Sequence, residues 1–297
     1  MKATKYLFLI VFAAGIIGSV YGQQPNTSMA PGTAGTTPAS TPEIKDVYER
    51  ENIVPEKKPI PYPHIREADV MWAKDIWRMI DLRQRMNYPL RFPEVEPIEN
   101  RYSLYLLLME GIRSEEITPY AFNDFNNPFS EPTSVKEVYN VIGCDTIFDA
   151  NGGVLSIDTR GTTVKGFYLK EKWYFDKQNS EMKVRITALA PLIITPKFDN
   201  NGQPLPGVNR IIPFFVYFPQ CRDSFATHAA YNPNNDAQTL SFDDLFIQRR
   251  FASTIAGESN EFGNRFIVDY TTGQDALLEA ERIKNDLFIM EHDLWEY

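Results

Sequence analysis

Apolar residues recur at helical spacing between Arg66 and Pro93, and this pattern predicts an α-helix of about five turns. Its two tryptophans, Trp72 and Trp77, are five positions apart, so about 140° separates them around the helix axis. One flat contact does not bury both side chains. We expect either a core helix between two layers, which is the commoner arrangement, or a helix with Trp77 toward the core and Trp72 toward a partner.

The ends and the polar side of this stretch also carry helix signals. Asp69 is in place for an N-cap, with Ile65 nearby, and Pro89 disfavours helical backbone before it, so the helix is expected to end near Asn87. Residues of opposite charge three or four positions apart predict ion pairs on the polar side, namely Asp75 with Arg78, Arg78 with Asp81, and Asp81 with Arg85.

Further helices are predicted on both sides of a central β region. Residues 101–113, 134–142, 222–230 and 243–251 have helical patterns, and Ser134 with Glu137 forms a capping-box pair. The long helix predicted after Thr272 has a regular apolar stripe of Ala276, Ala280, Ile283, Leu287, Met290 and Leu294.

The central region has the pattern of strands and turns. Residues 165–176 and 182–195 are predicted strands joined by a turn, with Val184, Ile186 and Ala188 on one face of the second. The unbroken apolar run 211–218 is expected to be buried on both faces, and Pro213 indicates a sheet edge. Turns are predicted at 151–153 and 199–202, with Gly207 in the second loop. The fold class is therefore α+β, with N-terminal helices, a central antiparallel β-meander and a C-terminal helix in one globular domain, 64–297.

Two segments precede this domain. Residues 1–22 have a basic start, an apolar run and small residues before Gln23, which is typical of a cleaved signal peptide. Residues 23–63 hold eight of the 21 prolines and are predicted to be a flexible linker. Its last part, 55–63, is expected to be extended, either as a spacer or as a strap that orders against a neighbouring copy.

The net charge and the lack of catalytic motifs limit the classes of function that we expect for the chain. A net charge of −9 argues against nucleic-acid binding and against docking on anionic lipid heads. His64, His228 and His292 have no metal-ligand spacing, and the chain lacks phosphate-loop and nucleophile motifs, so we predict no catalytic, cofactor-binding or metal residues and no cofactor. Asp243 and Asp244 are expected to complement a helix dipole.

Cys144 and Cys221 are the only cysteines. An exported chain enters an oxidising compartment, where two cysteines can form a disulfide. Because the sequence does not give the separation of their Cα atoms, it leaves both the bonded and the free state open.

Several long blocks carry a resemblance to a known family. They are Ala68–Trp72, Trp77–Gln84, Asn87–Pro89, Glu171–Gln178, Val184–Ile186, Ala190–Leu192, Tyr231–Asp236 and Phe242–Phe246. In this order they resemble the GldN/PorN family of periplasmic subunits of the gliding-motility and type IX secretion apparatus. The resemblance implies a non-enzymatic subunit that self-associates in a ring under the outer membrane with a lipoprotein partner. It also implies contact with the periplasmic part of an inner-membrane motor protein, and no direct membrane insertion after cleavage.

The alternative functions belong to other classes of protein. A periplasmic ligand-binding or hydrolytic domain would use some of the 15 tyrosines to line its site, and a chaperone would bind unfolded secreted clients. For the structural subunit, aromatic, methionine and arginine side chains are the expected interface anchors. The candidate partner interface is Trp72, Arg83, Met86, Phe214 and Tyr217.

Overall fold

A computed structural model describes residues 57–98, 101–148, 154–158, 161–198, 204–233, 235 and 240–293. The chain divides into two units, Met1–Glu49 and Arg50–Tyr297, and the described residues all belong to the second. The predicted signal peptide, most of the predicted linker, Leu294 and the turns predicted at 151–153 and 199–202 lie outside the described residues.

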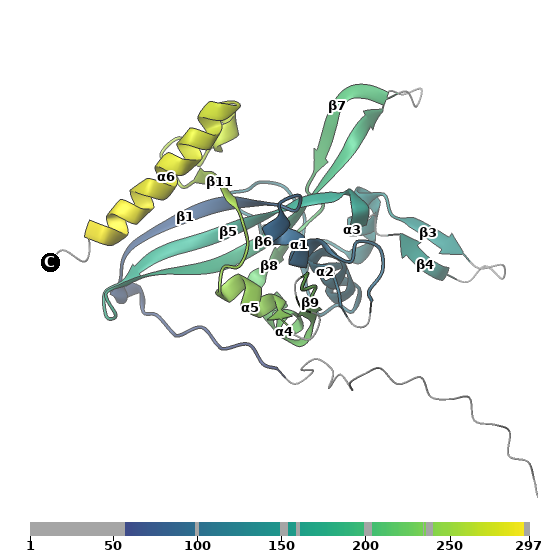
Figure 1. The fold of residues 1–297 in the computed structure, drawn as a ribbon, viewed down its shortest axis with the longest axis horizontal. Coiled ribbons are helices and arrows are strands. Elements are labelled where there is room, and N and C mark those ends of the chain that lie inside the picture. The colour runs from purple at the N-terminus through teal and green to yellow at the C-terminus, as the bar shows by residue number, and fades with distance from the viewer. Residues whose placement is uncertain are drawn as a thin grey trace, which may run out of the picture. The chain divides into compact units, whose positions relative to one another are not determined.

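A seven-stranded sheet is the frame of this unit, and each of its strand pairs is antiparallel (Figure 1). The strand order is β11 (Thr254–Glu258), β1 (Val70–Asp81), β5 (Val164–Asp176), β6 (Glu181–Phe198), β8 (Phe215–Tyr217) and β2 (Pro119–Tyr120). The remaining strand, β7 (Pro204–Ile211), also pairs with β6. Two small sheets are formed by β9 (Ala229–Ala230) with β10 (Leu240–Ser241), and by β3 (Asp145–Phe148) with β4 (Val154–Asp158).

Helices complete an α+β fold, as the sequence predicts. They are α1 (Tyr88–Arg91), α2 (Leu104–Arg113), α3 (Val135–Ile142), α4 (Phe218–Thr227), α5 (Phe242–Ile247) and α6 (Gln274–Asp293). Short 3-10 turns occur at η1 (Glu67–Asp69), η2 (Arg85–Asn87), η3 (Gly161–Thr163) and η4 (Ile267–Asp269). The capping box of Ser134 and Glu137 is confirmed at α3.

The predicted helix at 66–93 is wrong, because residues 70–81 form the strand β1. This strand pairs with β5 from Trp72 to Asp81 without interruption and with β11 on its other side. This strand, second from the β11 edge, has buried residues on both faces, such as Ile76 and Trp77, so its sequence lacks a clean two-residue period and imitates a helix. Alternation along β1 puts Trp72 and Trp77 on opposite faces of the sheet.

The N-cap, the helix end and the ion pairs predicted for this helix are therefore also wrong. Asp69 ends η1 and caps no α-helix, while Pro89 lies in the first turn of α1 and so begins a helix where the sequence predicts an end. The predicted ion pairs are wrong because a strand does not bring residues three or four positions apart into contact on one face. Arg78 pairs with Glu171 of β5 at 2.9 Å, and Asp81 pairs with Arg83 at 2.7 Å.

The other strands follow the prediction with local differences. β5 and β6 are confirmed, but Lys170 pairs with Ala188 and Glu171 with Ile186, so Thr187 is an extra residue in β6. This bulge turns Ala188 to the face opposite Ile186, against the expectation of one shared face.

The predicted strand 211–218 divides between the end of β7, an irregular turn at 212–214, β8 and the start of α4. Pro213 therefore lies between strands, and β8 is an inner strand covered by β2. Gly207, predicted in a loop, lies in β7 with a φ of 112°.

Three apolar clusters hold the layers together. The main core joins one face of the sheet to α1–α5, through residues such as Phe167, Leu108 and Phe246. A smaller cluster joins α6 to β1 and β11 through Ile76, Ile255 and Ile283. On the opposite face of the sheet, Trp77 and Phe215 pack with aromatic side chains of Tyr120, Phe125, Phe129 and Phe266.

Candidate interaction surfaces

The residues predicted as a partner interface do not form one patch. Trp72 is half-buried and packs against the α6 cluster, whereas Arg83 and Met86 are exposed in the turn after β1. Tyr217 is exposed on β8 and stacks edge-on with Phe129. Phe214 is fully buried in the main core, so it does not belong to a surface: the apolar run that contains it is core, not interface.

A buried ionic cluster separates the main core from the α6 cluster. Glu171 is fully buried and accepts hydrogen bonds from Arg78 Nε at 2.9 Å and Trp173 Nε1 at 3.0 Å. Arg249 Nη2 lies 2.9 Å from its other carboxylate oxygen, and burial lowers the pKa of Arg78 in spite of the carboxylate beside it. The Glu171 carboxylate of β5 thus joins β1 through Arg78 and the segment after α5 through Arg249. The block Glu171–Gln178, which carries part of the family resemblance, therefore contributes structure here.

The described residues contain no group of three or more histidine, cysteine or acidic side chains that could hold a metal ion. His64 and His292 are exposed. The Nδ1 atom of His228 lies 2.8 Å from the Ser224 carbonyl oxygen.

A second buried ion pair forms the centre of a surface that binds an extended segment of the same chain. Arg222 of α4 and Asp243 of α5 are joined by two hydrogen bonds, Nε to Oδ1 at 2.8 Å and Nη2 to Oδ2 at 3.0 Å. Burial opposes the charge of Arg222, but the bonds and attraction to Asp243 outweigh it and raise the pKa of the guanidinium. Arg222 Nη1 remains available, and it donates to the carbonyl oxygen of Ile60 at 2.7 Å. The pair thus binds extended chain from outside the two helices.

The segment bound there is Lys57–Pro63, here called the strap. It has neither helix nor strand, and the ring of Tyr62 lies 4.3 Å from the Arg222 guanidinium and 5.0 Å from that of Arg185. Arg185 also donates to the Pro63 carbonyl oxygen. At the other end Lys57 pairs with Asp244 and donates to Ser241 Oγ at 3.2 Å. The described end of the predicted linker therefore lies against its own domain, held by stacking on arginine and by charge.

These contacts give Asp243 and Asp244 a second role beside the predicted one of complementing a helix dipole. Ser241 accepts from Asp244 N and caps α5, and both acids lie in the first turn of that helix, where the dipole favours them. Each also has a basic partner far away in sequence, Arg222 or Lys57. Burial raises the pKa of Asp244, but the hydrogen bonds from Lys57 and Ser241 outweigh it and hold that pKa below its ordinary value.

A separate apolar groove of about 840 Å³ lies beside α1. Its aromatic lining is Tyr88, Phe92 and Tyr231, with Phe92 edge-on to both tyrosines. Val95 and Ile98 are exposed on its rim. Aromatic grooves of this size suit small molecules or proline-rich peptides.

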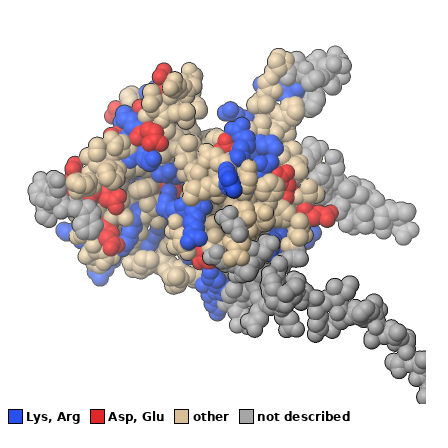
Figure 2. All heavy atoms as spheres, in the orientation of Figure 1, with Lys and Arg blue, Asp and Glu red and all other residues tan. Residues whose placement is uncertain are grey.

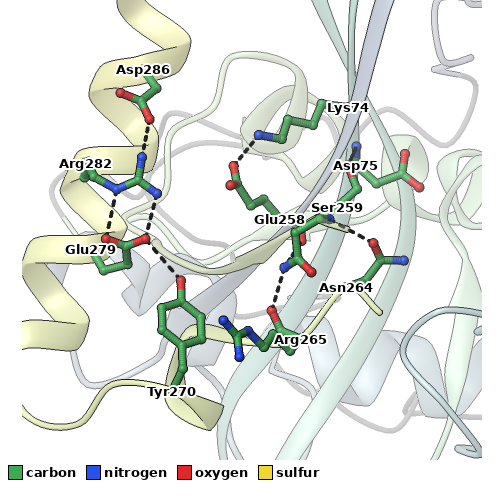
Figure 3. A network of polar contacts seen from close by, with 11 residues as sticks. Lys74, Asp75, Glu258, Ser259, Asn264, Arg265, Tyr270, Glu279, Arg282 and Asp286 are labelled. Atoms are coloured by element: carbon green, nitrogen blue, oxygen red, sulfur yellow. Dashed lines mark hydrogen bonds and ion pairs between the residues drawn. The ribbon is translucent and has the colours of Figure 1, made fainter. Parts of the chain in front are cut away.

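The third surface is the outward side of α6. Figure 3 shows Tyr270 pointing toward Glu279, to which its hydroxyl donates at 3.1 Å, and Arg282 lying between Glu279 and Asp286. The Tyr270–Glu279 bond joins α6 to the segment before it, and the Lys74–Glu258 ion pair, 2.6 Å, joins β1 to β11, the two strands against which α6 packs. The side away from the sheet exposes four large apolar residues, Leu277, Leu278, Phe288 and Ile289.

Neither cysteine forms a disulfide in the structure. Cys221 is buried on α4, where its thiol donates to the Tyr217 carbonyl oxygen and burial raises its pKa, while Cys144 is half-buried after α3. The disulfide that the sequence leaves open is thus absent from the described residues.

The face of the molecule in Figure 2 carries basic and acidic groups interspersed. No helix among the described residues is both long and apolar enough to span a membrane. A model of the family described as gliding motility associated protein GldN matches residues 65–296. No curated protein matches the chain.

Proposed function

Because the chain belongs to the GldN family, which is associated with gliding motility, we propose that it is a non-enzymatic structural subunit of a gliding and protein-secretion machine. The proposed subunit is exported, starts at Gln23 after cleavage, and forms a periplasmic ring with an outer-membrane lipoprotein. In this proposal the ring also contacts the periplasmic part of an inner-membrane motor protein. The family match over residues 65–296, which include nearly the whole folded unit, is the observation that carries the proposal.

The surfaces described above support an assembly role. The surface around Arg222 and Asp243 binds the extended strap through buried charges. The outward side of α6 exposes large apolar residues, which is typical of protein interfaces. The buried ionic groups hold segments together: Glu171 joins three segments, and Arg222 joins α4 to α5 through Asp243 and to the strap through the Ile60 carbonyl oxygen.

The apolar groove supports one alternative, a periplasmic ligand-binding domain. Its volume of about 840 Å³ and its three aromatic rings would accept a small apolar ligand. Of its two acidic lining residues, Glu94 and Glu96, the first pairs with Arg91 at 2.5 Å. Phe92→Ala and Tyr231→Ala should leave gliding intact if the structural role is correct, whereas a loss of gliding with normal assembly would favour the ligand-binding role.

Deletion of the gene followed by complementation tests the proposed function. We expect the deletion strain to lose both gliding and secretion, and the full-length chain to restore both. A chain without residues 1–22 should fail to restore them while accumulating to the same level, since the proposed site of action lies outside the cytoplasm. Normal gliding in the deletion strain, or rescue by the chain without residues 1–22, would contradict the proposal.

A further inference from the structure

One side of α6 packs against the sheet of its own domain, and the other side has no partner within the described residues. Ala280, Ile283 and Leu287 are buried against β1 and β11. The opposite side exposes 58% of Leu277, 64% of Leu278, 64% of Phe288 and 46% of Ile289. Four large apolar side chains on one solvent-facing helix are more than the scattered exposure of a monomer surface.

These four residues form two apolar layers near the two ends of the helix. Leu277 and Phe288 are eleven positions apart, so they lie about 16 Å apart along the axis and within about 20° of each other around it. Leu278 and Ile289 have the same separation, one residue further along. A second helix lying against this side would therefore meet apolar side chains at both ends.

The strip of this side nearest to Leu277 carries one charge of each sign between the two apolar layers. Glu281 and Lys284 are 71% and 62% exposed, and their charged groups are 3.3 Å apart. At 100° per residue both lie within about 40° of Leu277 around the axis. Their order matters, because the midpoint between Glu281 and Lys284 along the helix is also the midpoint between Leu277 and Phe288.

This common midpoint makes the strip of Leu277, Glu281, Lys284 and Phe288 complementary to itself. If a second copy approaches antiparallel about a two-fold axis through that midpoint, Leu277 meets the other copy's Phe288, and Glu281 meets the other copy's Lys284. Each contact then occurs twice. A parallel approach would instead place Glu281 against Glu281 and Lys284 against Lys284, which is repulsive.

We propose that the outward side of α6 is an isologous interface, on which a second copy of this chain docks its own α6 antiparallel. Only the place of this pair in a ring rests on the proposed function; the pairing itself is a property of the purified chain. A single helix pair buries little surface, so the dimer is expected to be weak in dilute solution and to be reinforced when other contacts hold copies close together.

The symmetry has a consequence for any closed assembly. A two-fold contact joins two copies and then has no free surface left, so it does not close a ring by itself. A ring that uses the α6 contact therefore needs a second kind of contact. Such a ring is expected to contain an even number of copies or to stack face to face with another ring.

Charge reversal provides the test. We expect the mature full chain to dimerise with increasing concentration in sedimentation equilibrium, and Glu281→Lys and Lys284→Glu each to be monomeric at the same concentrations. Mixed one to one, these two variants should form a heterodimer, because the first carries two positive charges on this side of α6 and the second carries two negative charges. The double variant E281K/K284E should dimerise like the original chain.

The controls separate this proposal from folding defects and from the proposed function. Lys136→Glu on α3 makes the same charge change as Lys284→Glu outside α6 and should leave dimerisation unchanged, and thermal melts should agree among all variants. A monomeric original chain up to its solubility limit, single variants that still dimerise, or a mixture that stays monomeric would each overturn the proposal. Co-purification of the lipoprotein partner is scored separately, so its absence would count against the proposed function alone.

Discussion

Arg222 and Asp243 meet through two parallel hydrogen bonds of 2.8 and 3.0 Å, with both side chains about 95% buried. The pair joins α4 to α5, and the one guanidinium nitrogen left over binds the Ile60 carbonyl oxygen of the strap. One buried ion pair thus serves both the packing of two helices and the binding of the N-terminal segment.

Removing one partner of this pair should be strongly destabilising. Arg222→Ala leaves the Asp243 carboxylate buried without its counter-charge, and we expect a loss of about 3 kcal/mol or more in the free energy of unfolding. Arg222→Lys keeps the charge but lacks the two-bond geometry, so it should lie between the original chain and the alanine variant. Urea unfolding of the three proteins measures the order, and equal midpoints would show that the pair contributes little.

The strap should detach in acid through Asp244. Its pKa is held below the ordinary value of 3.8, so its ion pair with Lys57 contributes full stability above that pH. The contribution is lost as the pH falls below 3.8 through the lowered pKa of the folded state. Protection of residues 57–63 against hydrogen exchange, corrected for the intrinsic exchange rate at each pH, should therefore fall in acid before protection of β5 does.

Asp244→Asn provides the matched comparison for this pH dependence. It removes the titrating group, so its strap should exchange faster already at neutral pH and respond less to acid. An identical acid profile in the two proteins would mean that Asp244 does not control the strap.

The prediction for Trp72 and Trp77 survives the change from helix to strand, because a strand also separates them. Trp77 is 3% exposed among aromatic rings, so Trp77→Ala should cost about 3–5 kcal/mol of folding stability. Trp72 is half-buried and lines a cavity of about 350 Å³ beneath α6, so Trp72→Ala should cost less. Thermal melts and co-purification with the partner should be compared for both variants. Equal destabilisation would remove the basis for treating Trp72 as an interface residue.

The features that the sequence predicts well depend on neighbours along the chain. The capping box at Ser134, the strand pair β5–β6 with its short turn, and the stripe of Ala280, Ile283 and Leu287 are local patterns that the structure confirms. The strand β1 depends on pairing with β5, about 90 residues later, and its own residues such as Ala73, Lys74 and Met79 favour helix or are neutral.

The interaction surfaces are also difficult to predict, because they bring together residues that are far apart in the sequence. Arg222 and Asp243 are 21 positions apart in the sequence, and the strap lies about 160 residues before Arg222. Exposure also differs from the prediction: Phe214 looks like an interface anchor by residue type, but the core buries it completely. Asp243 and Asp244 are the only charged residues in the apolar block Phe242–Phe246, and a buried carboxylate requires a partner. They are the signal in the sequence from which this binding surface for the strap could have been predicted.

A charge at Ile283 should release α6. This side chain is 1% exposed in the small cluster that holds α6, so Ile283→Asp buries an unpaired charge at a cost of several kcal/mol. Because that cluster is separate from the main core, we expect rapid hydrogen exchange in residues 274–293 with β5 still protected. Asn285→Asp, an exposed position on the same helix, is the control and should exchange like the original chain. Unchanged protection of α6 in the Ile283→Asp protein would contradict the packing described here.

Purification of the tagged full chain from detergent-solubilised envelopes, followed by electron microscopy, tests the structural role most directly. We expect that an outer-membrane lipoprotein co-purifies with the chain and that the particles are rings. A chain that elutes alone as a small particle, with ligand binding or turnover as its only activity, would contradict the structural role.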